Sequence, residues 1–113
     1  MQRDKSYLID IQISAESIVR YIEGKSSSTF YEDEMLQDAV IRRIEIMGEA
    51  ASRISEDLKS QYPTLPWKKM KAMRNILIHM YDELELEIVW DTITKDIPGL
   101  LNEMKKILPH IQD

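Results

Sequence analysis

The sequence contains no cysteine, and none of its apolar runs is long enough to cross a membrane. The absence of cysteine excludes a disulfide framework and thiolate metal sites, and it fits a reducing compartment. The first residues, from Met1 to Ser6, lack the apolar core of a signal peptide. We therefore expect a soluble, cytoplasmic protein without a membrane segment, folded as one domain over residues 1–113.

Signatures of nucleotide and metal binding are also missing. The chain has neither a Walker-type glycine loop nor a glycine-rich dinucleotide turn, so we do not expect it to bind a nucleotide by itself. Its two histidines, His79 and His110, are far apart and lack the carboxylate pattern of a metal site. The acidic residues at positions 82–87 are more typical of a solvated helix start than of a metal cage. We predict no metal and no cofactor of its own.

Apolar residues recur at three- and four-residue steps along most of the chain, which predicts helices. The expected helices cover residues 5–22, 34–60, 67–78 and 84–108, and the last is expected to kink or restart at Pro98-Gly99. The serine-rich stretch after Gly24 predicts a flexible loop that ends at Asp33, a helix N-cap. Nothing in the sequence reads as a strand. The expected fold is therefore an all-α, up-and-down bundle of four or five helices.

Gly48 lies inside the longest expected helix, where a glycine costs about 1 kcal/mol of helix propensity. A close crossing with another helix would offset this cost, because a missing side chain lets two backbones approach. A second, weaker apolar line on the same helix is expected to face another helix or another subunit; it consists of Ala39, Ile46 and Ala50.

Four polar groups lie within eight residues of one segment: the guanidinium of Arg74, the amide of Asn75, the imidazole of His79 and the phenol of Tyr81. A guanidinium binds phosphate through a bidentate fork, and an imidazole exchanges protons near pH 7. Each residue alone has an ordinary alternative, such as an ion-pairing arginine, a solvated helix-end histidine or a half-buried tyrosine. Their coincidence indicates chemistry on a phosphodiester.

The charge distribution supports contact with only a few phosphates. The formal net charge of −5 argues against broad coating of nucleic acid. Residues 64–81, however, hold four cations and no acidic residue, which leaves 11 basic against 20 acidic groups elsewhere. We predict that this basic island binds RNA through Lys68, Lys69 and Lys71 beside Arg74.

Helical geometry restricts how the polar cluster can act. At about 100° per residue, Arg74 and His79 point about 140° apart, whereas Asn75 and His79 form a close i,i+4 pair. Either the long arginine reaches around, or the helix ends before His79, or a second copy contributes across a two-fold axis. We favour the dimer, which builds a shared cleft from two motifs.

The pattern Arg-Asn-x3-His-x-Tyr, read together with residues 44–51, 62–67, 89–90 and 96–98, resembles the HEPN superfamily. In particular, it is similar to the HepT toxins, which pair with a minimal nucleotidyltransferase antitoxin, over about residues 5–110. The resemblance implies a homodimeric bundle and a metal-independent endoribonuclease, in which the ribose 2′-OH attacks the adjacent phosphate and leaves a 2′,3′-cyclic phosphate. It also implies that His79 is the general base or acid, that Arg74 stabilises the transition state and that Asn75 positions the site.

The resemblance assigns Tyr81 a separate role as the acceptor for AMP transferred by the antitoxin. Added adenylate would block RNA through charge and bulk. ATP and Mg²⁺ then belong to the nucleotidyltransferase partner. The expected function is the toxin of a type VII-like toxin–antitoxin pair. The alternatives are a non-nuclease helical binding partner of a minimal nucleotidyltransferase and a purely structural helical dimer.

Overall fold

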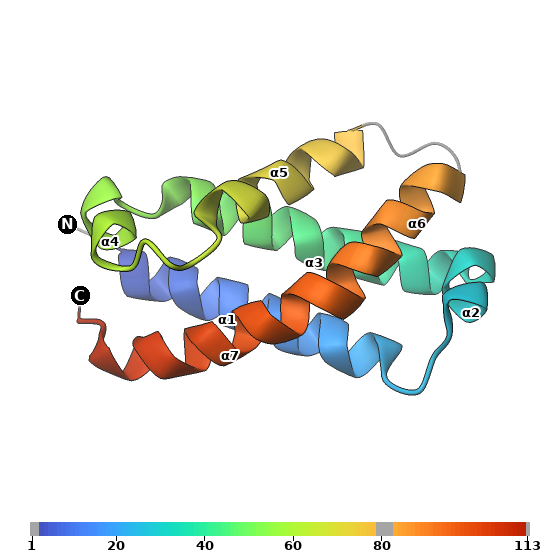
Figure 1. The fold of residues 1–113 in the computed structure, drawn as a ribbon, viewed down its shortest axis with the longest axis horizontal. Coiled ribbons are helices and arrows are strands. Elements are labelled where there is room, and N and C mark those ends of the chain that lie inside the picture. Colours follow the sequence, from blue (N-terminus) through green and yellow to red (C-terminus); the bar gives the residue numbers. More distant parts are fainter. Residues whose placement is uncertain (1–2, 79–82, 113) are drawn as a thin grey trace.

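A computed structural model describes residues 3–78 and 83–112, and the side chains of residues 3–74 and 86–112. Its long helices run alternately up and down, so that the first and last described residues lie at the same end (Figure 1). The long helices are α1 (Asp4–Ile22), α3 (Glu34–Arg53), α5 (Trp67–Ile78), and the connected α6 (Glu83–Asp91) and α7 (Ile97–Ile107). Helix α3 packs against both α1 and α5, and α7 packs against α1. The predicted all-α bundle is confirmed, and the described residues contain no strand.

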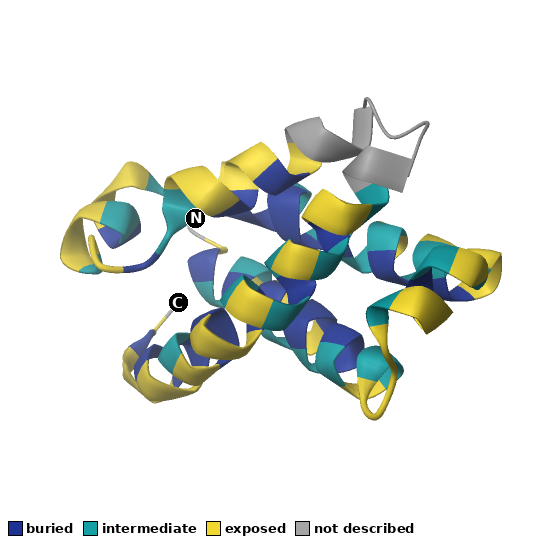
Figure 2. Cartoon of the chain, turned by 45° about the vertical axis from the view of Figure 1, so that its right-hand side comes forward, coloured by how far each residue is buried: buried dark blue, intermediate teal, exposed yellow. Residues whose placement is uncertain are grey.

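The core is formed by the apolar stripes of these helices, which face one another inside the bundle (Figure 2). The observed α1 and α5 match the predicted helices 5–22 and 67–78 closely. Within the described residues, no helix combines the length and the apolar character that crossing a bilayer requires. The largest fully buried side chains include Leu8, Ile11 and Ile18 of α1, Ile44 and Met47 of α3, and Ile97 and Met104 of α7.

The prediction of one unbroken helix over residues 34–60 is wrong. Helix α3 ends at Arg53, Ile54 adopts an extended conformation, and α4 (Glu56–Gln61) begins after Ser55. The Ser55 hydroxyl accepts a hydrogen bond from the backbone N–H of Leu58, as an N-cap does. The carboxylate of Asp4 in turn accepts hydrogen bonds from the backbone N–H of Ser55, at 2.9 Å, and from its hydroxyl, at 2.5 Å. This contact with the start of α1 favours the break.

The prediction of a flexible loop up to Asp33 is also wrong in part, because the short helix α2 (Ser27–Glu32) forms inside it. Ser26 caps this helix by accepting a hydrogen bond from the backbone N–H of Thr29. Burial of Phe30 fixes the segment, since its ring packs against Trp90 with 5.4 Å between the centroids. Asp33 is the N-cap of α3, as predicted, and it accepts a hydrogen bond from the N–H of Leu36.

A π-helical turn, η1 (Thr92–Asp96), separates α6 from α7. Pro98 has no N–H to donate to the carbonyl of Thr94, and its ring would clash with that carbonyl in an α-helix. The N–H of Ile97 instead bonds to the carbonyl of Thr92, five residues earlier. The predicted restart near Pro98 is therefore confirmed, and the irregular turn lies just before the proline.

Candidate active site

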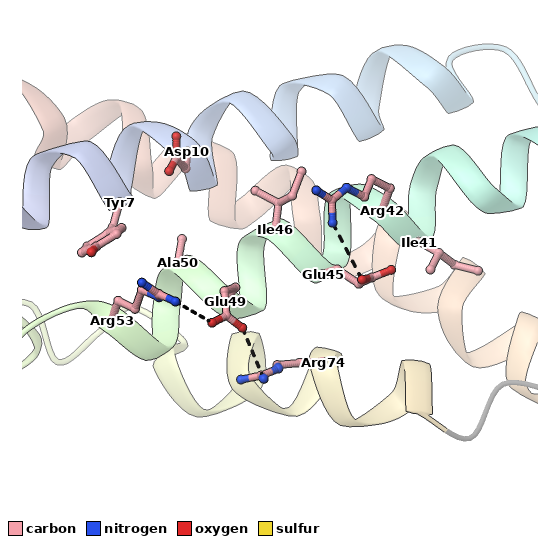
Figure 3. Close-up of a pocket in the computed structure, with 10 residues that line it drawn as sticks. All are labelled: Tyr7, Asp10, Ile41, Arg42, Glu45, Ile46, Glu49, Ala50, Arg53 and Arg74. Carbon is pink, nitrogen blue, oxygen red and sulfur yellow. Dashed lines mark hydrogen bonds and ion pairs between the residues drawn. The ribbon is translucent and has the colours of Figure 1, made fainter.

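Arg74 lies on α5 at the edge of a groove that is otherwise formed by α1 and α3 (Figure 3). We call this hollow the Arg74 groove; its volume is about 810 Å³. The Arg74 side chain is 47% exposed, so its guanidinium is accessible to a ligand. The other charged residues that line the groove are Asp10, Arg42, Glu45, Glu49 and Arg53.

Glu49 holds the Arg74 guanidinium in place. One carboxylate oxygen of Glu49 lies 3.3 Å from Nη2 of Arg74, and the other lies 3.2 Å from Nη2 of Arg53 (Figure 3). Hydrogen bonding with Tyr7, followed by that with Glu49, raises the pKa of Arg53 above its ordinary value. Arg53, Glu49 and Arg74 thus form one chain of ion pairs from α3 to α5.

Gly48 brings the backbones of α3 and α5 close together at this point. A Cβ atom added to Gly48 would lie 2.8 Å from the Cβ of Arg74 and 3.5 Å from the carbonyl oxygen of Met70. The first distance is too short for any side chain without movement of a helix. The close crossing predicted for this glycine is confirmed, and the residue opposite it is Arg74.

The Arg74 groove is electrically balanced, because three arginines and three carboxylates line it. Such a lining suits the recognition of one phosphate by one arginine rather than the binding of a long polyanion. Glu49 also occupies part of the guanidinium fork, since it contacts Nη2. A phosphate that bound Arg74 would therefore use its remaining N–H groups or displace Glu49.

The predicted RNA-binding lysines lie in a second groove, which we call the lysine groove. It is formed by α4, by the connection from Tyr62 to Pro66 and by the first turns of α5. Its volume is about 830 Å³, and four lysines line it against the single acidic residue Glu56. These lysines are Lys59, Lys68, Lys69 and Lys71.

The structure tests the remaining predicted site residues only in part. Asn75 belongs to α5, but its side chain is not among those described. His79 and Tyr81 lie outside the described residues, so their meeting with Arg74 stays a prediction. His110, the weaker histidine candidate, is exposed at the end of the 3₁₀ turn η2 (Leu108–His110).

Sequence reasoning missed three residues that the geometry places beside the predicted ones: Glu49, Lys59 and Trp67. A signal for Glu49 was present, because Glu49 and Arg53 have the i,i+4 spacing of a helical ion pair. Lys59 had no comparable signal, because the chain brings it beside the lysines of α5 only after the break between α3 and α4.

The fold and the site define a small helical protein with an anchored arginine in one groove and lysines in a second groove. The chain belongs to the Ribonuclease HepT-like family, whose pattern it matches over residues 11–107. This range includes Glu49, Arg74 and the whole segment up to Tyr81.

Curated relatives carry related names. A protein of Thermococcus cleftensis named "Probable ribonuclease HepT" is 38% identical over 91% of this chain and 94% of its own length. A "Putative RNase" of Methanocaldococcus jannaschii is 35% identical over 89% of this chain and 93% of its own length. A protein of the same organism named "Gamma-glutamylcyclotransferase and putative RNase" is 41% identical over 98% of this chain, and the chain spans 50% of its length. No solved structure matches this chain.

Proposed function

We propose that the chain is an endoribonuclease that acts as the toxin of a toxin–antitoxin pair in the cytoplasm. The observation that carries the proposal is the membership of residues 11–107 in the Ribonuclease HepT-like family. The matched range holds Arg74, Asn75 and His79 in the order Arg-Asn-x3-His. The exposure of the Arg74 guanidinium and its fixed position beside Glu49 support a role in contacting substrate.

The proposed reaction is an in-line attack of a ribose 2′-OH on the adjacent phosphorus. His79 takes the proton of the 2′-OH or gives one to the departing 5′-oxygen, and the products are a 2′,3′-cyclic phosphate and a 5′-hydroxyl end. Arg74 stabilises the charge on the phosphoryl oxygens, and Asn75 positions the site. Proton transfer contributes about 10²–10⁴-fold, and one well-placed donor contributes about 10²–10³-fold. Because these groups belong to the chain, the reaction requires no metal.

The proposed active unit is a homodimer. If the helix that carries Arg74 continued straight through His79, the two side chains would point about 140° apart and would not converge within one chain. Two copies related by a two-fold axis place the arginine of one chain near the histidine of the other. The site is therefore completed by the second copy.

The proposed antitoxin is a minimal nucleotidyltransferase that holds ATP and Mg²⁺. The phenol oxygen of Tyr81 attacks the α-phosphate of ATP, pyrophosphate leaves, and the tyrosine becomes an AMP ester. The added negative charge lies two residues from His79 and repels RNA. The intact mass after co-expression should increase by whole AMP units, and Tyr81→Phe should abolish the increase. An unmodified tyrosine in the presence of an active nucleotidyltransferase would contradict this part of the proposal.

The proposed ribonuclease activity is tested by incubating RNA with homogeneous protein in the presence of EDTA and measuring cleavage. Arg74→Ala and His79→Ala should each lower kcat/KM by at least about 10²-fold and leave the dimer intact. The matched control is Arg20→Ala on α1, which removes an arginine that stacks on Tyr21 outside both grooves. A substrate with a single 2′-deoxy nucleotide at the cleavage position should resist the wild type.

If both motif variants cleaved RNA at the wild-type rate, the activity would belong to a contaminant, and the proposal that this chain is a ribonuclease would be wrong. Modification at Tyr81 together with a complete absence of cleavage would then favour a binding partner of the nucleotidyltransferase. The observation that favours this second function is the net negative charge of the chain, which disfavours binding of RNA.

A further inference from the structure

We propose that the lysine groove is a second RNA-binding subsite, which holds the phosphates next to the scissile one and stacks a base on Trp67. This inference rests on the proposed ribonuclease function and adds Lys59 and Trp67 to its substrate-binding residues. Helix α5 contributes both Arg74 and three of the lysines of the lysine groove. The lysine groove, however, lies between α5 and α4.

The charge of the lysine groove favours a polyanion. Four lysines face one glutamate in its lining, although the chain as a whole carries a net charge of −5. Lys59 contacts Glu56 at 3.7 Å and Lys69 contacts Asp96 at 3.1 Å, and both are pairs near the surface. Among the side chains that the structure describes, Lys68 and Lys71 have no carboxylate within ion-pair distance. Their charges remain available to phosphates.

The spacing along α5 matches a strand of RNA that continues from Arg74. With a rise of about 1.5 Å and a turn of about 100° per residue, Lys71 lies about 4.5 Å along the axis and about 60° around it from Arg74, and Lys68 about 9 Å and about 120°, so the strand would wind around α5 from one groove into the other. A stacked strand advances by about 3.4 Å per nucleotide, so these distances correspond to one to three nucleotides. Lys68 and Lys71 are three residues apart and lie on the same side of the helix.

Trp67 supplies a rigid apolar surface in the same groove. Its indole N–H donates to the backbone carbonyl of Tyr62 at 3.0 Å, and the ring remains partly exposed. Leu65 is buried beneath the connection and Pro66 precedes the ring, so the backbone here is restrained. An aromatic ring of fixed orientation beside lysines is the arrangement that binds single-stranded RNA through stacking and charge.

The first test measures binding of uncleavable 2′-O-methyl RNA of about eight nucleotides by fluorescence anisotropy over a series of salt concentrations. Lys68→Ala/Lys71→Ala should weaken binding about tenfold and reduce the slope of log K against log salt by about 1.4. The matched control is Lys105→Ala/Lys106→Ala, which removes the same charge from exposed positions of α7. An equal loss in the control would overturn the subsite, because the effect would then come from net charge alone.

Cleavage kinetics separate this subsite from the reacting centre. With a long substrate, the Lys68→Ala/Lys71→Ala variant should have a KM about tenfold higher and an unchanged kcat, whereas cleavage of a dinucleotide should be unaffected. Equal loss on both substrates would place these lysines at the scissile phosphate and overturn the proposal. Because binding is measured with uncleavable RNA, the binding experiment still tests the subsite if the chain proves to have no ribonuclease activity.

A fluorescence experiment tests stacking. In Trp90→Phe, Trp67 is the remaining tryptophan, and its emission should be quenched when uncleavable RNA binds. Unchanged emission at saturating RNA would overturn the stacking contact. Unchanged RNA binding by Lys68→Ala/Lys71→Ala, with loss of a complex with the nucleotidyltransferase, would assign the groove to a protein partner instead.

Discussion

Gly48 and Glu49 are neighbours on α3 that together determine where Arg74 lies. Gly48 allows α5 to approach, and Glu49 binds the guanidinium that the approach brings near. The sequence predicted a close crossing at Gly48, because a glycine inside a helix needs a compensating contact. It could not identify Arg74 as the residue opposite, since that pairing depends on the rotation of α5 about its own axis.

Replacement of Gly48 by alanine should lower stability and displace Arg74. The alanine gains about 1 kcal/mol of helix propensity, but its Cβ overlaps the Cβ of Arg74, and overpacking costs about 1–3 kcal/mol. We expect the free energy of unfolding from urea titration to fall by about 1 kcal/mol. Gly99→Ala is the control, because no atom lies within 4 Å of the added Cβ. Equal stability of both variants would show that α3 and α5 adjust without cost.

Glu49→Gln should impair catalysis more than stability. The ion pairs of Glu49 are about half exposed, and such pairs contribute about 0–1 kcal/mol to stability. Without the carboxylate, the Arg74 guanidinium samples more orientations. Because a small misplacement of a catalytic group lowers the rate by up to about 10²-fold, we expect kcat to fall about tenfold with little change in KM. Glu49→Asp should recover part of the loss.

The control for Glu49 is Glu103→Gln on α7, where the carboxylate lies 3.4 Å from Lys106 and lines neither groove. Its kcat should equal that of the wild type. An increase in KM at constant kcat in Glu49→Gln would mean that Glu49 contacts the substrate itself and does not act through Arg74.

At the scale of elements, the sequence predicted the long helices and missed the breaks between short ones. The apolar stripe of α3 continues in register through Ile54 and Leu58, so periodicity alone indicates one helix. The break depends on Asp4, which is 51 residues from Ser55 in the sequence. Likewise, α2 forms because Phe30 is buried against Trp90 of α6, whereas its composition indicates a loop. Long-range contacts of this kind leave no local signature.

Asp4→Ala should destabilise the junction between α3 and α4. The Asp4 side chain is buried, with 6% exposure, and accepts two hydrogen bonds from Ser55. Hydrogen bonds to a charged group contribute about 1.5–3 kcal/mol, so we expect the free energy of unfolding in urea to fall by at least about 1.5 kcal/mol. Asp4→Asn retains an acceptor oxygen and should lose less. Equal loss in the two variants would mean that the junction needs both acceptor oxygens or the negative charge of the carboxylate, which asparagine lacks, because asparagine keeps the packing.

At the scale of the whole molecule, charge and surface shape determine which ligands the bundle can bind. The sequence predicted a basic island in an acidic chain, and the structure adds that its lysines line a groove with Lys59 of α4. Arg74 lies in a separate groove with balanced charge. The division of these cations between two surfaces could not be derived from the sequence, because it depends on how α4 and α3 pack beside α5.

The proposed dimer predicts that two inactive variants restore activity when they are mixed. Arg74→Ala and His79→Ala should each be inactive as homodimers, because every cleft lacks one of the two groups. A mixed dimer retains the arginine of one chain and the histidine of the other. If the two groups act across the two-fold axis, random mixing should restore about a quarter of the wild-type activity, since about half of the dimers are mixed and each holds one complete pair. Native mass spectrometry should show the mixed species. Mixed dimers without activity would require Arg74 and His79 of the same chain to meet, which contradicts a straight helix through both residues.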